Sequence, residues 1–197
     1  MNDTKSYILE MRGVLIERLA ARALLYLLVS SVFCGLSYTA VTLVSPDLDS
    51  AFVSPITEGC GTLEVARYLL RCTFPAAVSL LVVYAAAHTV MSHVIGMTVL
   101  CVRGLVLGCI GGLIGTGAEV GVHCSLALTL YFLATVLIIV LAALSDIFSK
   151  CLCRAYADHV PSLARELFFE YLRVFSVLAG GVFVLTALCS VALQYGI

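Results

Sequence analysis

A single arginine interrupts a long uncharged stretch of this sequence. Between Arg71 and Glu119, Arg103 is the only residue that carries a full charge. An arginine at depth in a membrane helix costs a few kcal/mol unless its guanidinium pairs or reaches the headgroups. We expect Arg103 to lie roughly 10 Å from one membrane surface and to snorkel toward it. A buried pairing that fixes assembly is the alternative.

Glycines recur directly after this arginine. Gly104, Gly108 and Gly112 are four residues apart and therefore form one stripe along a helix. Such small-xxx-small stripes let two helix backbones approach closely in a membrane. The stripe predicts helix packing within the chain, with an interface to a partner as the alternative. It is not a phosphate-binding loop, because no Gly-Lys-Ser/Thr follows it.

Other residues with chemical potential lack suitable partners. His88 and His93 are five residues apart, which places them on different faces of a helix. Cys151 and Cys153 form a single C-x-C pair, whereas a structural zinc site usually needs two pairs. No G-x-S-x-G or H-E-x-x-H motif is present. We therefore expect no metal site, no cofactor and no catalytic residues.

The composition identifies the class of protein that must hold these residues. Of the 197 residues, 62% are hydrophobic and 12% charged, and the mean hydropathy is +1.11. Ordinary soluble domains contain about 45–50% apolar residues. A net charge of −1 gives no support to nucleic-acid binding. The composition predicts an all-α polytopic membrane protein, with lipids and other membrane proteins as its partners.

The apolar runs predict five membrane-spanning helices in one domain covering residues 1–197. A bilayer span needs about 20 apolar residues, and the run from Cys72 to Ala118 is long enough for two. A turn should separate these two near His88 to Gly96, where polar residues gather. The expected spans are Ala23–Val44, Phe74–Met91, Val94–Gly117, Val122–Leu144 and Val174–Tyr195.

The distribution of basic residues predicts the orientation. Cytoplasmic segments carry an excess of Lys and Arg. With five spans and a cytoplasmic N-terminus, eight of the basic residues lie inside, and only Arg67 and Arg71 lie outside. The inside segments are then an amphipathic segment over residues 1–22 and a loop over 146–173 with an interfacial helix after Pro161. Residues 45–72 form the outside loop, where Cys60 and Cys72 could form a disulfide.

The segment Ala85 to Gly112, AAAHTVMSHVIGMTVLCVRGLVLGCIGG, resembles the middle of the stage II sporulation protein M family. A small-residue helix end, a short turn and an Arg-Gly-x-x-x-Gly element follow one another, the last matched by Arg103, Gly104 and Gly108. Chain length, a basic N-terminus and a longer outside loop are also similar. Proline, which the family often shows in the turn and fourth helix, is absent between Pro75 and Pro161.

The resemblance implies a non-enzymatic membrane scaffold in the cell membrane. Its partners would be membrane-associated peptidoglycan hydrolases, recruited to the septal membrane during forespore engulfment. A different class of function is the membrane subunit of a multi-component transporter, in which Arg103 would contact an anion. Transport pathways usually need several polar groups at depth, and the sequence supplies essentially one charge there.

Overall fold

The computed structural model describes the backbone of residues 2–44, 62–115, 122–157 and 161–195. Side chains are described for residues 18–43, 73–112, 125–157 and 164–192. All secondary structure in these ranges is helical. The helices are α1 (Asn2–Val44), α3 (Thr62–Ala86), α4 (Ser92–Gly115), α5 (Val122–Ala157) and α6 (Pro161–Tyr195).

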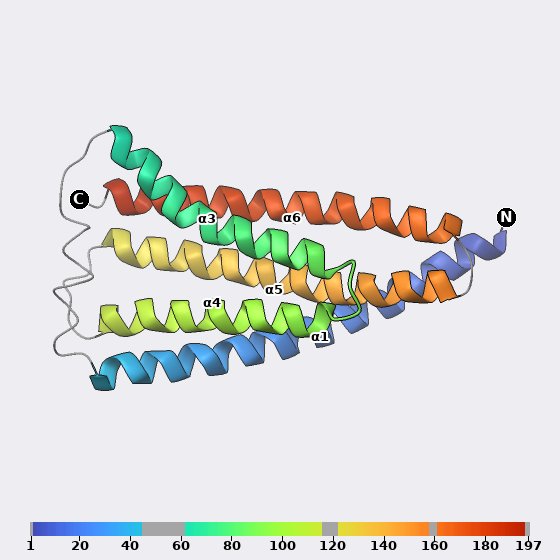
Figure 1. The fold of residues 1–197 in the computed structure, drawn as a ribbon, viewed down its shortest axis with the longest axis horizontal. Coiled ribbons are helices and arrows are strands. Elements are labelled where there is room, and N and C mark those ends of the chain that lie inside the picture. Colours follow the sequence, from blue (N-terminus) through green and yellow to red (C-terminus); the bar gives the residue numbers. More distant parts are fainter. Residues whose placement is uncertain (1, 45–61, 116–121, 158–160, 196–197) are drawn as a thin grey trace.

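The five helices form an elongated bundle. Figure 1 shows α1, α4 and α5 running side by side, while α3 runs obliquely across α6. α1 packs mainly on α4, and α6 packs mainly on α5 and α3. α1 begins at one end of the bundle, and α6 ends at the other (Figure 1). The α3–α4 turn and the start of α6 lie at one end of the bundle. The described Lys and Arg side chains other than Arg103 lie toward this end, which we call the basic end.

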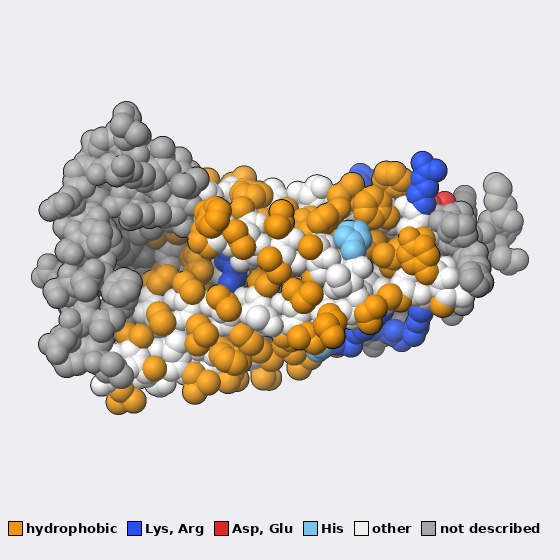
Figure 2. Space-filling model, in the orientation of Figure 1, with side chains coloured by type: hydrophobic (Ala, Val, Ile, Leu, Met, Phe, Trp, Pro, Cys, Tyr) orange, Lys and Arg blue, Asp and Glu red, His pale blue; other side chains and the backbone are white. Residues whose placement is uncertain are grey.

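The length and composition of the helices confirm an all-helical polytopic membrane protein. Four apolar stretches in the described residues are long enough to cross a bilayer: Arg18–Leu43, Ser92–Gly112, Ser125–Ala157 and Ala164–Ala192. α3 has a shorter apolar stretch, Thr73–Ala86, so its crossing stays a prediction. Figure 2 shows hydrophobic side chains over most of the described face, as expected of a surface in contact with lipid.

A tight turn divides the long apolar run, as predicted. α3 ends at Ala86 and α4 begins at Ser92. In the turn between them, the amide of Thr89 donates to the carbonyl of Ala86 at 2.9 Å, and the amide of Ser92 donates to the carbonyl of Thr89 at 3.3 Å. These bonds satisfy backbone groups that the helix ends leave unpaired. The described part of this apolar run therefore forms two helices.

The helices extend beyond the predicted spans. α1 includes residues 2–22. Residues 146–157 belong to α5 and residues 161–173 belong to α6, whereas the sequence predicted a loop over 146–173. The helix predicted after Pro161 is present and is continuous with the last predicted span in α6, and its place at a membrane interface stays a prediction. At 1.5 Å per residue, the 36 residues of α5 extend about 54 Å, well beyond a hydrocarbon core of about 30 Å.

The core combines small residues in mid-bundle with aromatic rings toward the basic end. Ala134, Ile138, Leu141 and Ala142 line the buried face of α5. Nearer the basic end, Phe148 stacks on Tyr171 with ring centroids 4.2 Å apart, and Tyr171 in turn contacts Tyr84 and Phe175. The small residues allow close helix approach, and the rings fill the wider space where α3, α5 and α6 meet.

Candidate functional site

Asp146 is a buried carboxylate near the basic end. It lies on α5, and only 1% of the residue is exposed. A buried carboxylate is costly unless cations or hydrogen-bond donors compensate it. The groups that compensate Asp146 therefore define the candidate site.

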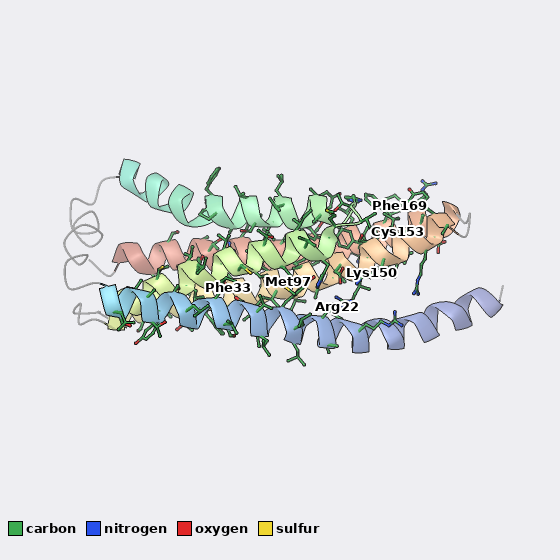
Figure 3. All side chains as sticks on the ribbon, turned by 60° about the horizontal axis from the view of Figure 1, so that its bottom comes forward. Arg22, Phe33, Met97, Lys150, Cys153 and Phe169 are labelled. Carbon is green, nitrogen blue, oxygen red and sulfur yellow. The ribbon has the colours of Figure 1, made fainter. Side chains whose placement is uncertain are left out.

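Two cations from different helices share one oxygen of this carboxylate. Arg22 Nη1 on α1 lies 3.3 Å from Asp146 Oδ2, and Lys150 Nζ, one turn further along α5, lies 3.0 Å from the same atom. Figure 3 labels both side chains, which lie where α1 meets the later part of α5. Their side chains are 35% and 53% exposed, so each joins the buried carboxylate to the surface.

His93, at the start of α4, adds a third helix to this group. Its Nδ1 lies 2.9 Å from the hydroxyl of Tyr26 and 3.3 Å from Arg22 Nη1. Because arginine can only donate, this geometry assigns Nδ1 as an acceptor and places the neutral ring's proton on Nε2. The distance of 3.9 Å between Nδ1 and Asp146 Oδ2 is too long for a hydrogen bond. We call Asp146, Arg22, Lys150, His93 and Tyr26 the charged cluster.

Hydroxyl groups near Asp146 connect α5 to the neighbouring helices. The hydroxyl of Ser149 donates to the carbonyl of Thr89 in the α3–α4 turn at 2.6 Å. Ser145 and Tyr171 form a hydrogen bond of 2.9 Å between α5 and α6. His88, in the same turn, lies beside the rings of Tyr84 and Phe168, away from His93. The two histidines are therefore in different environments.

Arg103 is buried in the bundle, so the prediction that it snorkels is wrong. Only 3% of the residue is exposed. It lies 11 residues from Ser92 and 12 from Gly115, about 17 and 18 Å along α4, which is too deep for its side chain to reach either end. Its Nε donates to Ser79 Oγ on α3 at 3.2 Å, and its Cζ lies 5.4 Å from the ring centroid of Tyr131 on α5. Nη1 and Nη2 have no hydrogen-bond partner among the described residues.

The glycine stripe packs against α1. A Cβ atom added at Gly104 would overlap the carbonyl oxygen of Ser30, and one at Gly108 would overlap the carbonyl oxygen of Cys34. At Gly112 it would meet the side chain of Val41 at 2.9 Å. These contacts agree with the interpretation that the stripe packs helices within the chain. The two backbones approach so closely because glycine has no side chain.

Arg103 and the three glycines were predicted from the sequence, but the charged cluster was not. One signal was available: Asp146 lies two residues after the predicted span Val122–Leu144, and Lys150 follows it at i+4. The predicted spans also place Arg22 and His93 at the same membrane surface. Residues 62–72 of the predicted outside loop belong to α3, so the loop is shorter than predicted, and residues 45–61 lie outside the described residues. The side chains of Cys60 and Cys72 are not among those described, so their disulfide stays a prediction.

The fold and the charged cluster define a multi-pass, all-helical membrane protein with a buried ion pair toward one end. Comparison of the chain with protein-family models, with curated proteins and with solved structures finds no match. Among the described residues, no group of three or more His, Cys, Asp and Glu side chains could hold a metal ion. The charged cluster joins three helices, α1, α4 and α5, through ion pairs and hydrogen bonds.

Proposed function

We propose that this chain is a non-enzymatic membrane scaffold, similar in role to the stage II sporulation protein M family. It would recruit peptidoglycan hydrolases to the septal membrane during forespore engulfment. In this proposal the chain lies in the cell membrane with its N-terminus in the cytoplasm. The segment over residues 45–72, of which 62–72 form the start of α3, then faces the hydrolases on the outside.

One observation carries the proposal: the buried hydroxyl groups of α5 and α6 are mostly bonded to their own helices. Thr135 donates to the carbonyl of Tyr131 at 2.9 Å, and Thr186 donates to that of Val182 at 2.9 Å. Ser190 likewise donates to Ala187 at 2.7 Å. A solute pathway needs polar groups that face one another at depth. Hydroxyl groups bonded within their own helices therefore support a role as a membrane anchor over a role as a solute pathway.

The rigidity of the bundle also supports a scaffold. The glycine contacts between α1 and α4 leave no room for a side chain, and the charged cluster joins α1, α4 and α5 near one end. Packed helix interfaces of this kind resist continuous deformation. A scaffold needs this property, because it must hold its outside segment in place without a conformational cycle.

The membrane subunit of a multi-component transporter is the second candidate. The buried guanidinium of Arg103 favours it, because two of its nitrogens have no partner among the described residues. A passing anion could supply acceptors for them. Ser79 and Tyr131, which contact Arg103, belong to α3 and α5, so an anion there would lie in the middle of the bundle.

A loop exchange tests the scaffold. Residues 45–72 are replaced by an unrelated hydrophilic sequence, and insertion and co-purification with peptidoglycan hydrolases are measured. We expect normal insertion and loss of the hydrolases. The matched control replaces residues 116–121, which lie on the same side in the five-span topology, and should retain the hydrolases. Co-purification that survives the exchange of residues 45–72 would contradict the proposed interface.

Purified protein in liposomes separates the two candidates. A scaffold should show no solute flux and no hydrolase activity by itself. Solute-specific flux that Arg103→Gln abolishes would establish the transporter function and rule out the scaffold. The protein should be full length in this assay, since Arg103 on α4 contacts side chains of two other helices, α3 and α5.

A further inference from the structure

The lengths of α1 and α5 bear on the depth of the charged cluster in a membrane. From Arg22 to Val44, α1 rises over 22 residues, and from Val122 to Asp146, α5 rises over 24. At 1.5 Å per residue, these distances are about 33 and 36 Å, close to the hydrocarbon thickness of about 30 Å. If the apolar ends of these segments lie at one surface of the hydrocarbon core, Arg22 and Asp146 lie at the other. Phosphate groups are found at this depth.

Two further arginines flank the charged cluster on the side away from the hydrocarbon. Arg18 lies one turn before Arg22 on α1, and Arg154 lies one turn after Lys150 on α5. Both are exposed, and both interact electrostatically with Cys151, so they lie near the same part of α5. We call Arg18, Arg22, Lys150 and Arg154 the basic surface. Figure 2 shows basic side chains gathered toward this end of the molecule.

The basic surface carries more positive charge than its carboxylate neutralises. Among the residues whose side chains are described, these four cations lie near one carboxylate, Asp146, which leaves a surplus of three positive charges in that part of the chain. The other described carboxylates, Glu166 and Glu170, are on α6, which packs on α5 and α3. A surplus of this size at a membrane surface attracts anionic lipid.

Asp146 gives the basic surface a fixed geometry. It holds Arg22 and Lys150 on one oxygen, so these two cations from different helices stay close together. Each keeps further N–H donors, because a guanidinium has five and an ammonium has three. Arg18 and Arg154 add two more planar forks, and such forks match the oxygens of a phosphate.

We propose that the basic surface binds the phosphate of an anionic phospholipid headgroup. Arg18 on α1 and Arg154 on α5 bind the phosphate oxygens. Arg22 and Lys150 supply positive charge on the side nearer the hydrocarbon. Asp146 is a positioning residue for the last two. The ligand class is an anionic phospholipid with an exposed phosphodiester, such as phosphatidylglycerol. This proposal does not depend on the scaffold function.

The test uses the full-length protein in a neutral detergent. Phosphatidylglycerol and phosphatidylcholine with identical acyl chains are added separately, and bound lipid is counted by native mass spectrometry. We expect the wild type to bind phosphatidylglycerol at least fivefold more tightly than phosphatidylcholine. The double variant Arg18→Gln/Arg154→Gln should lose most of this preference. It should still fold, because neither arginine contacts Asp146 in the structure.

The control removes two positive charges from α6 instead. Arg165→Gln/Arg173→Gln has the same net charge as the test variant and should keep the preference for phosphatidylglycerol. An equal loss of preference in both double variants, or a normal preference in Arg18→Gln/Arg154→Gln, would overturn the proposal. So would tight binding of a soluble poly-glutamate peptide without lipid preference, since this would identify an acidic protein segment as the occupant.

Discussion

Gly108 on α4 lies directly against the carbonyl oxygen of Cys34 on α1, so that no side chain fits between the two helices. The hydroxyl of Ser37 lies at the same point and donates to the carbonyl of Leu105 at 2.7 Å. The contact therefore combines close backbone packing with a hydrogen bond between the helices. Such contacts drive helix association in membranes, where the hydrophobic effect contributes little.

Gly108→Ala should destabilise the protein by about 1–3 kcal/mol, because the added methyl group overlaps backbone that cannot move aside. The measurement is the midpoint of thermal unfolding in detergent, followed with a dye that reacts with free thiols as they become exposed. Six free cysteines in the described residues suit this method.

The chain offers two matched controls for this substitution. At Gly35 and Gly180, a Cβ atom would meet nothing within 4 Å. Gly35→Ala and Gly180→Ala should therefore be neutral, or stabilise by about 0.5–1 kcal/mol as alanine replaces glycine in a helix. Equal effects at Gly108 and at the control positions would contradict the close packing of α1 on α4.

Asp146→Asn should lower the free energy of unfolding by about 1–3 kcal/mol, since it removes the charged partner of Arg22 and Lys150. Both cations are partly exposed and can turn to water, which limits the loss. Glu166→Gln, at an exposed position on α6, is the control and should have little effect. An Asp146→Asn variant as stable as the wild type would show that the ion pairs contribute nothing.

Arg103→Met should raise the midpoint of thermal unfolding, with a gain of about 1–3 kcal/mol. Methionine removes two buried nitrogens that have no partner among the described residues. Arg103→Lys should be less stable than Arg103→Met, because it keeps the buried charge and loses the planar guanidinium that faces Ser79 and Tyr131. If Arg103→Met instead unfolds at a clearly lower temperature, Arg103 has a structural role that these contacts do not explain.

Cysteine labelling in intact cells tests the proposed orientation. Variants that retain one cysteine each, Cys60 or Cys153, are treated with a membrane-impermeant maleimide. Cys153 is exposed on α5 toward the basic end, so its reactivity reports the side on which that end lies. We expect Cys60 to be labelled in intact cells and Cys153 only after the membrane is opened. The opposite pattern would reverse the proposed topology.

The helical class and the turn within the apolar run were predictable because each depends on local composition. The rise in polarity from His88 to Ser92 coincides with the turn between α3 and α4. The continuation of α5 past Leu144 was not predictable from hydropathy, since Asp146 and Lys150 resemble the start of a loop. In the structure, tertiary contacts satisfy these charged residues within a helix.

The glycine stripe could be found from spacing alone, but its partner helix could not. Which helix faces Gly104, Gly108 and Gly112 depends on the arrangement of the whole bundle. The same limit explains the error at Arg103: its depth could be estimated from the sequence, but the face of α4 on which it lies could not. The burial of Arg103 between α3 and α5 results from contacts with residues that are far away in the sequence.

The bond between Ser149 and Thr89 also bears on how the chain is made. The two residues are 60 positions apart in the sequence. At a synthesis rate of about 5–20 residues per second, the α3–α4 turn leaves the ribosome about 3–12 seconds before Ser149 does. During that interval the carbonyl of Thr89 has the amide of Ser92 as a partner but lacks the hydroxyl of Ser149, so water can occupy its second acceptor site. We therefore expect the turn to stay at the hydrated membrane surface until α5 arrives.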